Sequence, residues 1–101
     1  MAGTGNTSIR SYNFFLDGTI AASGLYTDNF HAFVDTGSGV IFQSQTIMLL
    51  NDSANDIWFS FDGVNDHGRV VTSEKFTQDF RRERQIWFRG TGADTFRFWA
   101  Y

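Results

Sequence analysis

The chain of 101 residues contains neither cysteine nor proline. Without cysteine, disulfide bonds, thiolate metal sites and a cysteine nucleophile are excluded. Without proline, every turn has to be formed by Gly, Asn, Asp and Ser, the other residue types that favour turn conformations. Ten glycines are available for this purpose.

A strong net charge and long apolar runs are also missing. The formal net charge is −3, which gives no electrostatic case for nucleic acid, where a basic patch is expected. The longest aliphatic run covers residues 47–50, far fewer than the ~20 residues of a membrane helix. Residues 1–8 lack the basic and apolar segments of a signal peptide. We therefore expect a soluble protein with no direct nucleic-acid or membrane partner.

Aromatic residues are abundant, with 12 Phe and 3 Trp. The length is close to the commonest domain size, and a domain of this length buries roughly 60–70% of the surface of its unfolded chain. Each buried aromatic side chain covers about 150–250 Å², so Phe and Trp are expected to dominate the core. Residues 1–8 are small and polar and are expected to form a flexible N-terminal arm. Residues 9–101 are expected to form one domain.

Short apolar runs alternate with turn signals at intervals of ~8–12 residues, which is typical of a β-sandwich or small barrel. No amphipathic helical pattern is present. The sequence predicts an all-β, single-domain antiparallel β-sandwich or small barrel. The Asp17-Gly18 pair is read as a turn. The clearest expected strands cover residues 9–16, 40–50 and 57–61.

The C-terminal stretch, residues 85–101, consists of two apolar runs around the turn Gly90–Asp94. Because side chains alternate between the faces of a strand, Ile and Phe of both runs fall on one face. Pairing the runs as a C-terminal hairpin places Phe88 opposite Phe96, so this face of the hairpin is apolar and excludes water. A shift of one residue would mix apolar and polar positions, so the register is expected to be well specified.

The reverse face of the expected hairpin carries Trp, Tyr and Arg, whereas a half-buried strand is usually polar on its outer face. Trp, Tyr and Arg are enriched in the hot spots of protein interfaces. The tryptophan of the strand at residues 57–61 points outward in the same way. The alternative is that these aromatics cover an edge of the sandwich or pack under a loop. The protein-interface residues that we predict are Trp58, Trp87, Arg89, Arg97, Trp99 and Tyr101.

Four potential metal ligands lie close together in one loop: Asp62, Asn65, Asp66 and His67. A calcium loop needs oxygen ligands at alternating spacing and usually a downstream bidentate Glu, and this loop has neither. Asx side chains that stabilise turns account for the same residues. No metal site is predicted.

No pattern of catalytic residues is present. His31 and His67 have Asp neighbours, but acid–base catalysis needs a positioned partner and a pocket. The Gly-Thr-Gly segment at residues 90–92 lacks the Lys-Ser/Thr terminus and the following helix of a phosphate-binding loop. We predict no enzymatic activity and no cofactor.

Two other binding surfaces are possible. The arginines at positions 81, 82, 84, 89 and 97 form a local basic cluster, which includes the charged corner at residues 81–84 (RRER), here called the basic corner. We interpret the cluster as solvated, with Glu83 and Asp79 as partners; a docking patch for an acidic protein surface is the alternative. Outward tryptophans could also stack on sugars in a carbohydrate-binding module. The arginines interleaved with them suit a protein interface at least as well.

Three segments carry a resemblance: NDSANDIWFSFDG with the following DHG in residues 51–68, then RQIWFRG and the closing DTFRFWAY. In these segments the chain resembles small virion structural proteins of tailed bacteriophages. The resemblance covers the C-terminal half, and residues 1–50 add no motif to it.

The resemblance implies a non-enzymatic β-sandwich that is located in the virion, docks on the phage particle and stabilises it. Capsid decoration (cement) proteins act in this way, and neck and tail structural components are the alternative. The implied partners are other virion proteins, such as the major capsid protein, and further copies of the chain in a homo-oligomer. A carbohydrate-binding β-sandwich module remains the second alternative.

Overall fold

A computed structural model describes residues 13–101 of the chain. The expected N-terminal arm and the beginning of the expected first strand lie outside the described residues. No helix in residues 13–101 is long and apolar enough to cross a lipid bilayer. The elements of the described part are β1 (Phe14–Thr19), the 3-10 turn η1 (Tyr26–Asp28), β2 (Phe30–Ala32), β3 (Thr46–Asn51), β4 (Ile57–Ser60), β5 (Gly68–Val70), β6 (Lys75–Asp79), β7 (Gln85–Arg89) and β8 (Thr95–Ala100).

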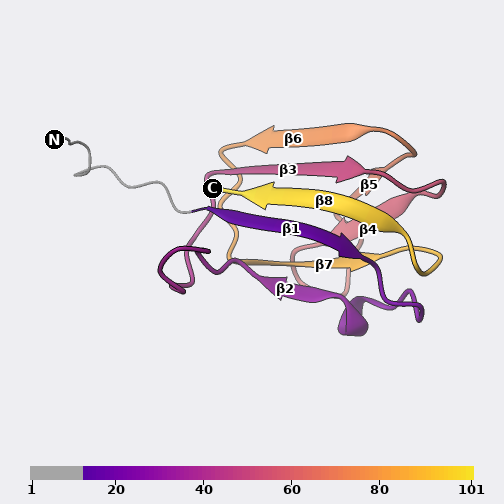
Figure 1. The fold of residues 1–101 in the computed structure, drawn as a ribbon, viewed down its shortest axis with the longest axis horizontal. Coiled ribbons are helices and arrows are strands. Elements are labelled where there is room, and N and C mark those ends of the chain that lie inside the picture. The colour runs from indigo at the N-terminus through magenta and orange to yellow at the C-terminus, as the bar shows by residue number, and fades with distance from the viewer. Residues whose placement is uncertain (1–12) are drawn as a thin grey trace, which may run out of the picture.

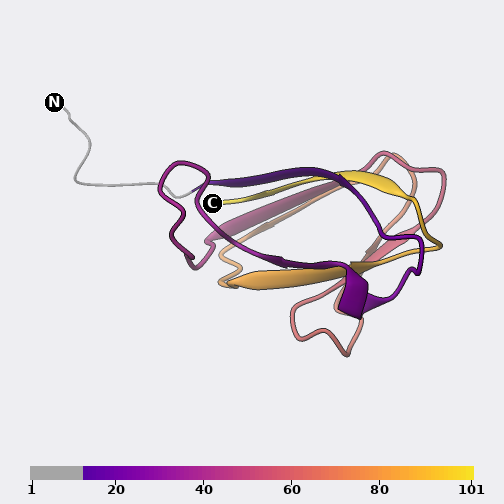
Figure 2. The ribbon, with the colours of Figure 1, turned by 60° about the horizontal axis from the view of Figure 1, so that its bottom comes forward.

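The strands form two antiparallel sheets of four strands each. The front sheet has the order β1-β8-β3-β6 and the back sheet the order β2-β7-β4-β5. Figure 1 shows the front sheet nearer the viewer, and Figure 2 shows β1 and β8 in one layer with β7 in the other. The prediction of an all-β, antiparallel β-sandwich is confirmed.

The core lies between the two sheets and consists mainly of aromatic side chains. Residues 16, 98, 49 and 76 form one cross-strand row on the inner face of the front sheet. The inner face of the back sheet supplies Ile57, Phe59, Ile86 and Phe88, which are at most 2% exposed. Burial of apolar surface stabilises the fold by roughly 25 cal/mol per Å², so this row-on-row packing is the main source of stability.

A buried polar side chain connects the two sheets. Asn51, at the end of β3, is fully buried. Its Nδ2 donates to the carbonyl of Val70 in β5 at 2.8 Å and to the carbonyl of Asn55 at 2.7 Å. Its Oδ1 accepts from the backbone and the hydroxyl of Ser53. Because a buried polar group without partners is costly, these bonds fix the distance between front and back sheets at this end.

The predicted C-terminal hairpin is wrong. β7 pairs with β2 and β4 in the back sheet, whereas β8 pairs with β1 and β3 in the front sheet. Phe88 does meet Phe96, but across the interior of the sandwich, with ring centroids 4.6 Å apart. The expected apolar residues therefore do face the core, but from two strands in different sheets, and the connection between these strands passes from the back sheet to the front sheet.

The connection between β7 and β8 explains this crossing. The carboxylate of Asp94, 3% exposed, accepts a hydrogen bond from the backbone of Thr91 at 3.0 Å. Ile20, which follows β1, donates to the Asp94 carbonyl at 2.8 Å and accepts from Ala93 at 2.9 Å. The turn is thus attached to the end of β1, and it leads the chain into the front sheet.

Two further expectations were wrong. Asp17 and Gly18 lie within β1, where Gly18 faces Phe96 and leaves room for its ring. The expected strand at residues 40–50 is regular only from Thr46, the first residue of β3. Before it, the buried hydroxyl of Ser44 donates to the carbonyl of Arg81 at 2.6 Å. Single backbone hydrogen bonds, from Phe42 to Phe33 at 3.0 Å and from Ser44 to Glu83 at 2.7 Å, also hold this segment, in place of a regular strand ladder.

Candidate functional site

The six predicted interface residues all point away from the core, and none of them is fully buried. They do not form one surface, because β7 and β8 lie in different sheets. The outer face of the back sheet carries Trp58, Trp87 and Arg89. The outer face of the front sheet carries Arg97 and Trp99, with Tyr101 directly after β8.

On the back sheet, Arg89 is the centre of a cluster with Tyr26, Trp58 and Asp66, here called the arginine cluster. Its guanidinium carbon lies 4.5 Å from the centroid of the Trp58 ring and 5.7 Å from that of Tyr26. Asp66 receives two hydrogen bonds from Arg89, from Nε at 2.9 Å and from Nη2 at 2.6 Å. The Tyr26 hydroxyl donates to the same carboxylate. Stacking and bidentate pairing are interactions for which arginine is better suited than lysine.

The charges of the arginine cluster are balanced at neutral pH. The hydrogen bonds from Arg89 and Tyr26 lower the pKa of Asp66 to about 2. The hydrogen bond with Asp66 raises the pKa of Arg89 above its usual range. Burial, followed by the hydrogen bond to Asp66, raises the pKa of Tyr26. The cluster therefore holds one carboxylate, one guanidinium and one neutral phenol in a fixed geometry.

Trp87 lies under a loop, as one of the two interpretations of the outward aromatics expected. Gly63 has a φ of +78°, and a Cβ atom at this position would lie 2.9 Å from the Trp87 ring. Figure 2 shows the loop on the side of the back sheet that faces away from the front sheet. Phe30 of β2 contacts Trp87 as well, with ring centroids 4.9 Å apart. Both Trp58 and Trp87 therefore have a ring face occupied by the chain itself.

The front sheet exposes an apolar surface that no element of residues 13–101 covers (Figure 1). Phe15 packs beside Trp99, with ring centroids 5.2 Å apart, and is 45% exposed. Phe15 lies in the expected strand at residues 9–16 but was not among the predicted interface residues. We call this surface the front patch; it consists of Phe15, Met48, Leu50, Trp99 and Tyr101.

Arg97 lies between the apolar residues of the front patch, and its charge is neutralised by a carboxylate. Its Nε lies 2.9 Å from Oδ2 of Asp52. The hydrogen bond from Arg97 lowers the pKa of Asp52, and the same bond raises the pKa of Arg97. The middle of the patch is thus apolar and electrically neutral.

The four potential metal ligands of residues 62–67 are engaged in hydrogen bonds within the protein. Asp62 Oδ1 accepts from the backbones of Val64 at 2.8 Å and Asn65 at 2.9 Å, which hold the pKa of the carboxyl well below its usual range. His67 Nδ1 accepts from the backbone of Phe61 at 2.8 Å. In the part of the chain that the structure describes, no group of three His, Cys, Asp or Glu residues is arranged to hold a metal ion. The Asx-turn interpretation fits this geometry.

His31 lies on the inner face of the back sheet. Its ring centroid is 5.8 Å from that of Phe88 and 6.4 Å from that of Phe96. Burial lowers the pKa of His31, so the neutral form is favoured in the folded state. Its surroundings are those of a core residue.

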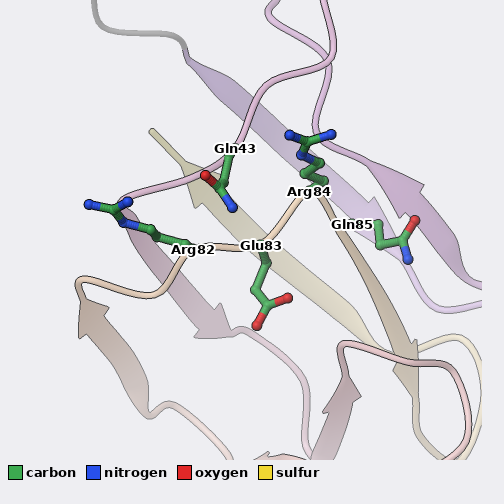
Figure 3. A pocket seen from close by; sticks show the side chains of 5 residues that line it. All are labelled: Gln43, Arg82, Glu83, Arg84 and Gln85. Carbon is green, nitrogen blue, oxygen red and sulfur yellow. The ribbon is translucent and has the colours of Figure 1, made fainter.

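The basic corner contains one paired and two exposed arginines. Arg81 lies 2.8 Å from Glu83 and its guanidinium covers the Phe61 ring, with 4.2 Å between Arg81 Cζ and the ring centroid. Asp79, the other expected partner, accepts a hydrogen bond from Thr46 at 3.3 Å instead. A shallow cavity of about 290 Å³ lies at this corner. Its lining residues are Gln43, Arg82, Glu83, Arg84 and Gln85. Figure 3 shows the Arg84 and Glu83 side chains on opposite sides of the segment.

No protein-family model matches the chain, and no curated protein is similar enough to match it.

Proposed function

We propose that the chain is a non-enzymatic structural protein of a bacteriophage particle. It docks on other virion proteins, such as the major capsid protein, and stabilises the particle as a capsid decoration (cement) protein. The observation that carries the proposal is the arginine cluster, a rigid group of Trp, Tyr and Arg on the outer face of a sandwich whose core is complete without it. The resemblance to small virion structural proteins supplies the context.

Pre-organisation favours binding through this cluster. Immobilising a rotamer-rich side chain at an interface costs about 0.5–1.5 kcal/mol. In this chain Arg89 is already fixed by Asp66 and by the Trp58 ring, so a partner does not have to order it. Trp, Tyr and Arg in such positions are the residue types that dominate measured interface energies.

Arg69 extends the same surface with hydrogen-bond donors. It lies beside Trp58 on β5, on the side opposite Arg89, and its side chain is 57% exposed. The nearest carboxylate, that of Asp56, is 3.8 Å away, which is too far for a hydrogen bond. Its guanidinium can therefore bind carboxylate or carbonyl oxygens of a partner protein at the rim of the contact.

Two alternatives differ in how well the geometry supports them. A neck or tail component of the same virion would use the same surface on another partner. A carbohydrate-binding module has less support, because sugar stacking needs a free ring face, and Arg89 and Gly63 occupy faces of Trp58 and Trp87.

Co-sedimentation with phage capsids that lack the protein tests the proposal. We expect saturable binding of the wild-type protein and a loss of about 30-fold in affinity for Trp58→Ala, the effect of removing a hot spot of about 2 kcal/mol. Phe80→Ala is the control, because this aromatic side chain is 92% exposed and follows β6 of the front sheet, whereas Trp58 and Arg89 of the cluster belong to the back sheet.

A wild-type protein that never associates with capsids would refute the capsid decoration. Binding to isolated tails instead would support the neck or tail alternative. A saturable tryptophan fluorescence change with a glycan, with no binding to either particle, would favour the carbohydrate-binding module.

A further inference from the structure

The outer face of the front sheet is apolar in its middle and charged at its two edges. The middle strands β8 and β3 contribute Trp99, Met48 and Leu50, and Arg97 between them is neutralised by Asp52. The edge strand β1 carries an exposed Asp17, and the opposite edge strand β6 carries an exposed Lys75. These two charges have opposite signs.

Asp17 and Lys75 lie at the two ends of a single cross-strand row. In the strand register, Asp17 lies opposite Arg97, Arg97 lies opposite Leu50, and Leu50 lies opposite Lys75. With strands about 4.8 Å apart, roughly 14 Å separate the two ends. The neighbouring row on the same face has the order Phe15, Trp99, Met48 and Thr77.

We propose that this face binds a second copy of the chain, face to face, around a two-fold axis that runs parallel to the strands between β8 and β3. Such a rotation places β1 over β6 of the second copy. Each cross-strand row then faces the same row of the second copy, in reversed order. Asp17 then faces Lys75 of the second copy, and the symmetry forms this pair twice. In the neighbouring row, Trp99 faces Met48 of the second copy.

The commitment to a second copy follows from this self-complementarity. In a two-fold interface the same patch must match itself, and a row with Asp at one end and Lys at the other does so when it is reversed. At the centre, a thioether beside an aromatic ring makes a favourable contact of about 0.3–1.5 kcal/mol. Two sheets that pack face to face with nearly aligned strands are a common arrangement in β-sandwiches.

The size of the face predicts a weak and reversible dimer. Four strands of about six residues cover roughly 19 by 20 Å, or about 380 Å² in projection. A standard interface buries about 800 Å² of accessible surface on each partner. The dimer is therefore expected to dissociate on dilution. The inference deepens the self-association expected under the proposed function, but a dimer would stand even if capsid binding failed.

Sedimentation velocity over a concentration series at low ionic strength tests the proposal. It compares the wild-type protein with variants in which the charge at position 17 or 75 is reversed. Asp17→Lys puts two lysines opposite each other, and Lys75→Asp puts two aspartates opposite each other. Because like charges across an interface are strongly unfavourable, each variant should lose at least about tenfold in dimer affinity. An equimolar mixture of the two variants restores both opposite-charge pairs and should form a heterodimer. The double variant D17K/K75D should dimerise by itself for the same reason.

Asp28→Lys is the matched control, because it makes the same charge change at η1, which packs against β7 of the back sheet. It should dimerise like the wild-type protein, and so should Trp58→Ala, which separates this inference from the capsid proposal. A wild-type protein that stays monomeric at every concentration would overturn the inference. So would single variants that dimerise normally or a mixture that stays monomeric.

Circular dichroism checks the fold of each variant, since the substitution D17K places a second cation beside Arg97. If Asp17→Lys does not fold, Lys75→Asp decides alone, because this side chain is exposed on an edge strand beside Leu50. Unchanged dimerisation of the folded K75D protein would then refute the proposed axis, and a loss of dimer would support it.

Discussion

Arg89 holds Asp66 by two hydrogen bonds on the outer face of the back sheet, from Nε to Oδ1 at 2.9 Å and from Nη2 to Oδ2 at 2.6 Å. Arg89 belongs to β7, whereas Asp66 belongs to the loop between β4 and β5. The pair therefore attaches this loop to the sheet, close to the position where Gly63 covers Trp87.

Acid should weaken this attachment. Because the folded pKa of Asp66 is about 2, below the ~3.9 of an unfolded chain, its contribution is present above pH ~4 and is lost as the pH falls through ~2. Both partners are more than a third exposed, so water screens the pair and it contributes about 1 kcal/mol or less. The free energy of unfolding, measured in urea at several pH values from neutral to acidic, should decrease less steeply with falling pH for Asp66→Asn than for the wild-type protein. Identical slopes would contradict the assignment.

Gly63 and Gly39 separate backbone strain from the contact with Trp87. Both have positive φ, +78° and +74°, but an added Cβ meets the Trp87 ring only at Gly63. The left-handed conformation costs about 1–2 kcal/mol for a residue with a Cβ. Overpacking adds about 1–3 kcal/mol at Gly63. Gly63→Ala should therefore destabilise more than Gly39→Ala and shift the tryptophan emission, whereas equal effects would mean that the loop does not press on Trp87.

Phe88 should be one of the most important side chains for stability. It is fully buried and contacts Phe96 and Phe98, with ring centroids 4.6 and 5.6 Å away. Phe88→Ala is expected to lower the free energy of unfolding by about 3–5 kcal/mol. Phe80→Ala, at a position that is 92% exposed, should change it by less than about 0.5 kcal/mol. Chemical denaturation measures both, and a small effect at Phe88 would argue against packing across the sandwich.

His31 should make stability depend on pH near neutrality. Burial lowers its folded pKa below the ~6.5 of an unfolded chain. As the pH falls below ~6.5, the unfolded chain takes up the proton first, so the free energy of unfolding decreases. In His31→Gln this decrease should be smaller. Thermal melts between pH ~7.5 and ~5.5, about one unit on either side of the ~6.5 of an unfolded chain, compare the two proteins. An unchanged pH profile would show that His31 is accessible to solvent.

Alternation in the sequence was sufficient to predict which side chains of β7 and β8 enter the core. Ile86, Phe88, Phe96 and Phe98 are all at most 1% exposed. It could not predict the partners of these strands, because two apolar runs around a glycine turn look the same in a hairpin and in a crossing between sheets. The outcome depends on contacts distant in sequence, such as the bonds between the Gly90–Asp94 turn and Ile20.

The same limit applies to the outward residues. The outward direction of Trp87 and Trp99 was predicted correctly, but their separation onto opposite faces follows from the strand order. Phe15 was not predicted as an interface residue, although it lies in the expected strand at residues 9–16. Asp17-Gly18 was interpreted as a turn, whereas it continues β1, where Gly18 accommodates the Phe96 ring. Asp66 was considered as a metal ligand, and its partner Arg89 is 23 positions away in the sequence.

Under the proposed function, the arginine cluster is the surface that docks on the phage particle. Hydroxyl-radical footprinting of the three tryptophans, in the free protein and on saturated capsids, tests it most directly. We predict that the oxidation rate of Trp58 falls several-fold on the capsid, while that of Trp87, already covered by Gly63, changes little. An unchanged rate for Trp58 on capsids that carry the protein would contradict the account.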